Sequence, residues 1–163
     1  MFINRFVLLI LFFSSYAYAD LNIQNWKTPN GTQVYFVENH SLPVVDVNVM
    51  FSAGSVRDSK QTNGVASMTN HLMFSGSAGK SEQKLMNSFA DIGAQIGSNF
   101  NRDQSSFSLR TLSEEKSEAI ELFKIVLQKP NFDKEILDRE AKRYVLILHK
   151  QRQCPRRLPL RDS

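Results

Sequence analysis

The stretch that decides the fold reads Gly64-Val65-Ala66-Ser67-Met68-Thr69-Asn70-His71-Leu72-Met73-Phe74-Ser75-Gly76. Its apolar residues recur at helical spacing, which predicts one short buried helix. Asn63 or Gly64 can begin this helix, and Ser75-Gly76 can end it because glycine turns readily into the left-handed conformation. The predicted apolar stripe consists of Val65, Met68, Leu72 and Met73. The polar residues Ser67, Asn70 and His71 lie together on one face.

The outline of this stretch, a small-residue lead, a helix and then Leu-Met-Phe-Ser-Gly, resembles the metal-binding helix of the insulinase/pitrilysin zinc metallopeptidases. These enzymes are relatives of the mitochondrial processing peptidases, and their helix carries the inverted motif His-x-x-Glu-His. The two histidines bind one zinc ion, and the glutamate polarises the bound water as general base. The resemblance places the three motif positions at Ser67, Asn70 and His71. Only His71 therefore keeps a metal-ligand side chain.

The family's third ligand is a glutamate on a later helix, and the resemblance implies its position here. Phe132-Asp133 matches the start of that helix, and counting along it from Arg139-Glu140 places the ligand at Ile147. Isoleucine cannot bind zinc, and an asparagine at position 70 cannot accept a proton from water. We therefore expect no zinc cofactor, no catalytic residue, and a hydrogen-bonded core role for His71.

Alternating and helical patterns predict the remaining elements. A β-hairpin is expected over 24–28 and 33–38, around Pro29-Asn30-Gly31, and further strands over 44–51, 94–99 and 105–112. The pattern places Phe107, Leu109 and Thr111 on one strand face. Helices are expected over 81–92, with Ser81 as the cap, from Ser113 until Lys129-Pro130-Asn131 breaks the helix, and over 133–149. For the second of these helices we expect an apolar stripe of Ile120, Leu122, Phe123, Ile125, Val126 and Leu127.

This order of elements favours an α+β fold with a mostly antiparallel sheet and helices packed on one side. The resemblance covers about Leu21 to Lys150, which implies a metallopeptidase-like N-terminal domain over 20–150 that is incomplete and C-terminally truncated. The segment 151–163 holds four arginines, two prolines and the only cysteine, so we expect an aberrant or disordered basic tail.

The N-terminus has the pattern of a secretory signal peptide over 1–19. Arg5 precedes an apolar run, and Ala17-Tyr18-Ala19 forms the cleavage site. We therefore expect secretion, into a bacterial periplasm, without stable membrane insertion after cleavage. An uncleaved membrane anchor is the alternative, although the apolar run is short for a bilayer.

The charge of the chain gives no argument for nucleic-acid binding. Between Asp20 and Lys150 the chain has 15 basic and 15 acidic residues, so the basic isoelectric point is a property of the two ends. With one cysteine, the chain forms no internal disulfide.

The segment Gly97-Ser98-Asn99 matches the place where active relatives have an edge strand that pairs with extended peptides. Gly97-Ser98 replaces the family's usual Asn-Ala pair, and an ordinary edge strand is the alternative. The resemblance implies a non-catalytic subunit that binds peptides and pairs with a catalytic subunit of the same family. An active zinc endopeptidase with displaced ligands and an inactive truncated remnant stay open as alternatives.

Overall fold

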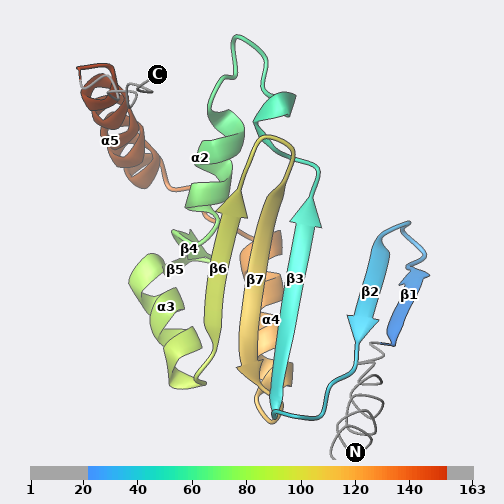
Figure 1. The fold of residues 1–163 in the computed structure, drawn as a ribbon. Helices are drawn as coiled ribbons and strands as arrows, with labels where there is room; N and C mark the ends of the chain where they lie inside the picture. Colours follow the sequence, from blue (N-terminus) through green and yellow to red (C-terminus); the bar gives the residue numbers. More distant parts are fainter. Residues whose placement is uncertain (1–21, 154–163) are drawn as a thin grey trace, which may run out of the picture. The chain divides into compact units, whose positions relative to one another are not determined.

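The computed structural model describes residues 22–153 of the chain (Figure 1). The chain divides into two compact units, residues 1–42 and residues 43–163, which are considered separately below. The predicted signal peptide over 1–19 lies outside the described residues, as do residues 154–163 of the predicted tail. No helix in the described range is long and apolar enough to cross a membrane.

The first unit contains the predicted β-hairpin. Strands β1 (Ile23–Lys27) and β2 (Gln33–Val37) pair antiparallel, with Trp26 opposite Val34. Gly31, at the turn, has a left-handed φ of 84°, a conformation that glycine adopts without a side-chain clash. The turn residues between the two apolar runs therefore identify this element correctly.

The second unit is built on a three-stranded antiparallel sheet. Its strands are β3 (Val44–Phe51), β6 (Gln95–Phe100) and β7 (Ser105–Leu112), in the spatial order β3-β7-β6. All three confirm strands expected from the sequence, and the sheet confirms the antiparallel α+β class. Strand β6 lies at one edge of this sheet.

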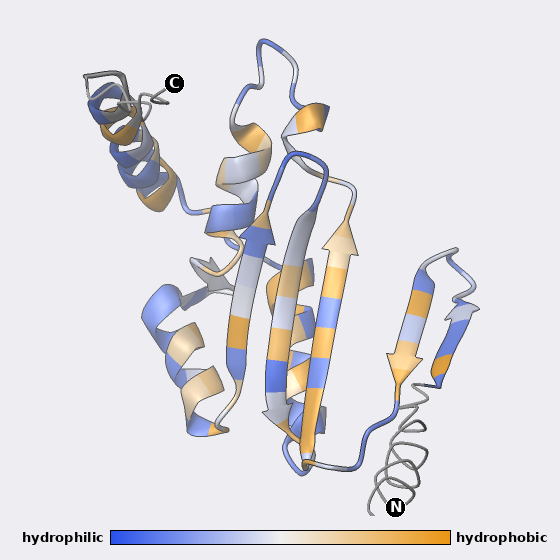
Figure 2. Ribbon diagram, viewed as in Figure 1, coloured by the Kyte–Doolittle hydropathy of each residue, from blue (hydrophilic) through white to orange (hydrophobic). Residues whose placement is uncertain are grey.

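The two faces of the sheet differ in polarity, which follows from the alternation of side chains along each strand. On the inner face Val47 pairs with Leu109 and Val49 pairs with Phe107. On the outer face Arg110 makes two hydrogen bonds to the carboxylate of Asp46, of 2.7 and 2.9 Å. The hydropathy alternates along β3 in the same way (Figure 2).

Helices α3 (Glu82–Asp91) and α4 (Lys116–Gln128) bury their apolar faces in the core of this unit. Ser81 caps α3, as predicted, by accepting a hydrogen bond from the backbone N–H of Lys84. The core cluster consists of Met73, Leu85, Phe89, Ala94, Phe107, Leu109, Ala119, Phe123 and Val126. Phe107, Leu109 and Thr111 are all buried, which confirms that they share one face.

Helix α4 differs in two ways from its prediction. It begins at Lys116 rather than Ser113, because residues 113–115 form a turn before it. Ile120 is 41% exposed, whereas the unpredicted Ala119 is completely buried. Ala119, Phe123 and Val126 therefore form the part of the apolar stripe that faces the core, and Ile120 lies at its solvent-exposed edge.

Two short strands, β4 (Gly76–Ser77) and β5 (Lys80–Ser81), follow the central helix. The completely buried Ser77 hydroxyl lies 2.9 and 2.7 Å from the backbone carbonyls of Ile125 and Lys129 at the end of α4. The Asn131 side chain bonds the N–H of Gly79 and the carbonyl of Lys80. These bonds fix the chain that leads into the last helix.

The last described helix, α5, runs over Lys134–Gln153. The predicted helix ended at His149, so the boundary placed at Lys150 falls inside α5, and residues 151–153 are helical rather than disordered. Several apolar side chains of α5 are exposed, including Val145 at 52%, Leu146 at 63% and Ile147 at 42%.

Candidate functional site

The central helix of the sequence is α2 (Val65–Leu72). It begins after Gly64, whose φ of 93° lies in the left-handed region. The carboxylate of Asp58 accepts hydrogen bonds from the N–H groups of Gly64 and Ala66, at 2.9 and 3.2 Å, and so stabilises the start of the helix. The loop between β3 and α2 contains a short 3-10 helix, η1 (Ser55–Arg57).

Two predictions about α2 are wrong in detail. The helix ends at Leu72, and Gly76 instead begins β4 with a φ of 131°. Val65 is 55% exposed and takes no part in the buried stripe, while Leu72 and Met73 are buried as predicted. Val65 is the first helical residue, so its side chain lies where the chain enters from the exposed loop.

Asn70 lies at the motif position that the resemblance gives to the general base. It is buried, and its side-chain amide donates hydrogen bonds to the carbonyl of Asn99 at 3.3 Å and to the hydroxyl of Ser105 at 2.6 Å. Both acceptors belong to the β6–β7 hairpin. Asn70 therefore joins α2 to the edge of the sheet, and its bond to the Asn99 carbonyl needs an N–H donor, which a carboxylate does not have.

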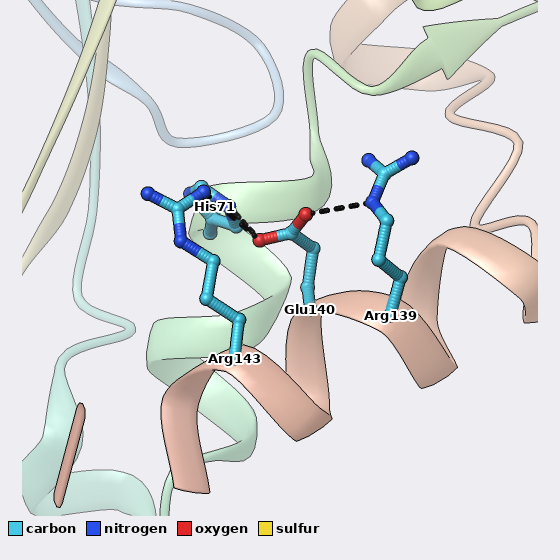
Figure 3. Close-up of polar contacts among 4 residues, drawn as sticks. All are labelled: His71, Arg139, Glu140 and Arg143. Atoms are coloured by element: carbon cyan, nitrogen blue, oxygen red, sulfur yellow. Dashed lines mark hydrogen bonds and ion pairs between the residues drawn. The ribbon is translucent and has the colours of Figure 1, made fainter. Parts of the chain in front are cut away.

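His71 is hydrogen-bonded as expected, but its side chain is 42% exposed, so the expected core role is wrong. It faces helix α5, where it meets a carboxylate. Its Nε2 lies 3.2 Å from Oε2 of Glu140, and its ring packs edge-on against Tyr144 with the centroids 5.8 Å apart. The side chain of Glu140 is only 7% exposed, and Arg139 and Arg143 reach it at 3.0 and 3.5 Å (Figure 3). We call His71, Arg139, Glu140 and Arg143 the α2–α5 ion cluster.

The hydrogen bond from Arg139 holds the pKa of Glu140 below its ordinary value. Burial of the carboxyl opposes this shift, and the hydrogen bond and charge of His71 add to it. Glu140 is consequently an anion at neutral pH, and it is the buried negative centre on which three basic side chains converge.

The residues present do not fit a zinc ion of the catalytic kind, which needs three protein ligands and an open position. Within residues 22–153 no group of three or more His, Cys, Asp or Glu side chains is arranged to hold a metal. His71 and Glu140 bond each other, and the amide of Asn70 points to Asn99 and Ser105. Ser67 is half-buried on α2.

Sequence reasoning placed the third ligand position at Ile147 and missed Glu140. The carboxylate that reaches His71 comes from Glu140, two helical turns before Ile147. The assignment of Ile147 to the ligand position stays a prediction. The sequence did contain a signal for Glu140. It lies midway between Ile136 and Tyr144 at i, i+4 spacing, so these three side chains share one face of α5, and all three are at least partly buried.

The predicted peptide-binding segment Gly97-Ser98-Asn99 lies in the middle of β6, the edge strand. The tip of the β6–β7 hairpin is held by the N–H groups of Ser55 and Val56, which bond the carbonyls of Asn101 and Arg102. At Gly54 a side chain would collide with the backbone of Arg102. The edge is therefore fixed at its tip by this loop and beside it by Asn70.

The comparisons with known proteins agree with this geometry. A family model described as insulinase, peptidase family M16, matches residues 33–160. The chain belongs to the insulinase family. Among solved structures, an insulinase-family domain from Pseudomonas fluorescens whose title calls it inactive is 36% identical and has a TM-score of 0.79. That match covers 83% of this chain and 33% of the other.

The curated relatives are more distant in sequence. The probable mitochondrial-processing peptidase subunit beta of Arabidopsis thaliana is 29% identical over 69% of this chain and 21% of its own length. The bovine cytochrome b-c1 complex subunit 1 is 25% identical over 63% of this chain and 22% of its own. The chain thus spans about a fifth of these relatives.

Proposed function

We propose that this chain is a non-catalytic, secreted member of the insulinase family that binds extended peptides along β6 and pairs with a catalytic subunit of the same family. The observation that carries the proposal is the placement of Asn70. At the position of the general base, this side chain is buried and its amide is used as a donor to the β6–β7 hairpin.

The absence of catalysis is supported both by the missing general base and by the missing zinc ligands. Asn70 has no basic atom to take a proton from water, and its side chain is held away from solvent. His71 is bonded to Glu140, and neither Ser67 nor Ile147 offers a group that binds zinc well. Each replacement alone would abolish the reaction that the motif supports in active relatives.

Peptide binding is supported by the state of the edge strand. A free edge presents unpaired N–H and C=O groups, which can bind another extended chain by β-augmentation. Ser98 is exposed although its side chain is on the inner face, opposite Phe107. The helices therefore leave the middle of β6 accessible.

Pairing with a second subunit is supported by the relatives. The names of the two curated proteins above describe subunits, and the Pseudomonas fluorescens structure is titled an inactive domain. Secretion to a bacterial periplasm is supported by the Ala17-Tyr18-Ala19 pattern after the apolar run.

To test the proposal, we would measure the zinc affinity of variants in which the motif is restored step by step, by titration against a competing chelator. The series comprises the wild-type chain, Ser67→His with Asn70→Glu, and the same pair with Ile147→Glu. We expect zinc affinity to rise sharply only at the triple variant, because two histidines hold the ion weakly and leave its geometry undefined. Equal affinity of the double and triple variants would show that Ile147 is not the ligand position.

Activity and binding complete the test. We expect the wild-type chain to leave fluorogenic peptides uncleaved with or without added zinc, and to bind unstructured peptides saturably. Methylation of alternate backbone nitrogens of the peptide should weaken binding, because those N–H groups would pair with β6. Zinc-dependent cleavage by the wild type would overturn the proposal, and the absence of any peptide binding would favour an inactive remnant.

A further inference from the structure

Gly97 leaves a bare patch of backbone on the outer face of the edge strand. Gln95 and Asn99 lie on either side of it on the same face, and both are exposed. Ser108 is its partner on β7, and the Ser108 hydroxyl donates a 3.4 Å hydrogen bond to the carbonyl of Gly97. Glycine weakens a strand interior, and its presence there often marks a place where a ligand or a second backbone approaches closely.

The direction of the backbone groups on β6 follows from the hairpin. The N–H of Asn101 donates to the carbonyl of Gln104, which makes these two residues a hydrogen-bonded pair. Bonded pairs alternate along an antiparallel ladder, so Gly97 and Asn99 also point their N–H and C=O groups toward β7. The N–H and C=O groups of Ile96, Ser98 and Phe100 therefore point away from β7, to the open edge. Within residues 22–153, no backbone hydrogen bond from a turn, loop or helix cap reaches these groups.

A peptide paired antiparallel with β6 would bond Ile96, Ser98 and Phe100. Gly97 would then occupy a non-hydrogen-bonded position, where the side chains of facing residues come closest together. The peptide side chain facing Gly97 would lie on the outer face, above the glycine backbone and Ser108. No side chain of β6 competes for this space, because glycine has none.

We infer that β6 selects extended peptides that carry an aromatic side chain opposite Gly97, an inference that rests on the proposed function. A ring can lie flat on the glycine backbone, bury it, and shield the ladder on both sides, which is how aromatic residues compensate for glycine in sheets. The neighbouring Gln95 and Asn99 are uncharged. Arg110, the partner of Gln95 on β7, is already bonded twice by Asp46, so an acidic peptide side chain would compete with Asp46 for it.

The experiment measures the affinity of the purified full chain for fluorescein-labelled decapeptides by fluorescence anisotropy. The peptides share an extended threonine- and valine-rich sequence and differ only at one central position, which is Phe, Leu or Ala. We expect the Phe peptide to bind about two- to fivefold more tightly than the Ala peptide, in line with cross-strand aromatic pairs. The Leu peptide should fall between them.

The decisive variant is Gly97→Ala, which places a methyl group under the ring. Because the new Cβ would lie 3.0 Å from the Ser108 hydroxyl, Gly97→Ala combined with Ser108→Ala serves as a second variant that removes this close contact. Both should bind the Phe and Ala peptides with nearly equal affinity. Ser117→Ala, at an exposed position of α4 outside the binding strand, is the control and should keep the preference for Phe.

The outcomes separate the two levels of the proposal. Equal affinity of the wild type for the Phe and Ala peptides, or a Phe preference that survives in both Gly97 variants, would overturn the aromatic inference while leaving peptide binding intact. Failure of every peptide to bind would overturn the proposed function and this inference with it.

Discussion

Helix α4 is held by apolar burial, whereas helix α5 is held by a charged cluster. Ala119, Phe123 and Val126 of α4 are at most 3% exposed and pack in the core. Among the described side chains of α5, Glu140 alone is buried, while Val145 and Leu146 face solvent. Apolar burial is nondirectional, but the α2–α5 ion cluster requires each side chain at a particular place and charge. The attachment of α5 should therefore depend on pH, and that of α4 should not.

The largest effect is expected from the apolar side of this comparison. Phe123→Ala should lower the free energy of unfolding by about 3–5 kcal/mol, because it removes a buried ring and leaves a cavity. Urea denaturation followed by circular dichroism measures this loss. Ile120→Ala, on the same helix at a 41% exposed position, is the control and should cost clearly less. Equal costs at the two positions would mean that α4 is not anchored through its buried face.

A smaller, pH-dependent effect is expected from the charged side. Glu140→Gln should lower the free energy of unfolding by about 1 kcal/mol at pH 7, because it keeps the shape of the side chain but loses its charge-assisted bonds. The folded-state pKa of Glu140 is lowered, so its stabilisation is present above the unfolded value of about 4.3 and is lost as the pH falls through the folded value.

The measurement is a pair of urea titrations at several pH values between 7 and 3. The difference between wild type and Glu140→Gln should be constant near neutrality and shrink as the pH falls below about 4.3. Asp46, whose pKa is also lowered by its bond to Arg110, is present in both proteins, and its contribution cancels. A difference that does not change across this range would contradict an ionic role for Glu140.

The smallest effect is expected on the exposed face of α5. Leu146 is 63% exposed, so Leu146→Gln should change the free energy of unfolding of the isolated chain by less than about 0.5 kcal/mol. The same urea titration at pH 7 tests this. A loss as large as that of Phe123→Ala would show that α5 is held by apolar contacts as well, and the contrast between the two helices would fail.

Most of the fold could be predicted from local patterns. Alternation identified β3 and β7 and gave the inward face of Phe107, Leu109 and Thr111, because one face of this sheet is buried and the other is polar. The Ser81 cap could also be predicted, since serine is a preferred N-cap residue when it directly precedes a helical pattern.

The errors arose at residues whose burial or hydrogen bonding depends on tertiary contacts. Apolar spacing placed Val65 inside, but the exposed loop before α2 leaves nothing to cover it. Glu140 was missed because its partner His71 is distant in sequence and comes next to it only after folding. The hydrogen bonds of Asn70 were equally invisible, since they require the β6–β7 hairpin to be in place.

The strand order β3-β7-β6 has a consequence for the order of folding. Strands β6 and β7 are joined by a tight turn, in which the side chain of Asn101 accepts bonds from the N–H groups of Asp103 and Gln104. This hairpin can close quickly, whereas β3 must find β7 across a long intervening segment that includes α2 and α3. The rate-limiting step should therefore be the docking of β3, and until then one edge of β7 stays open to wrong partners in a crowded nascent chain.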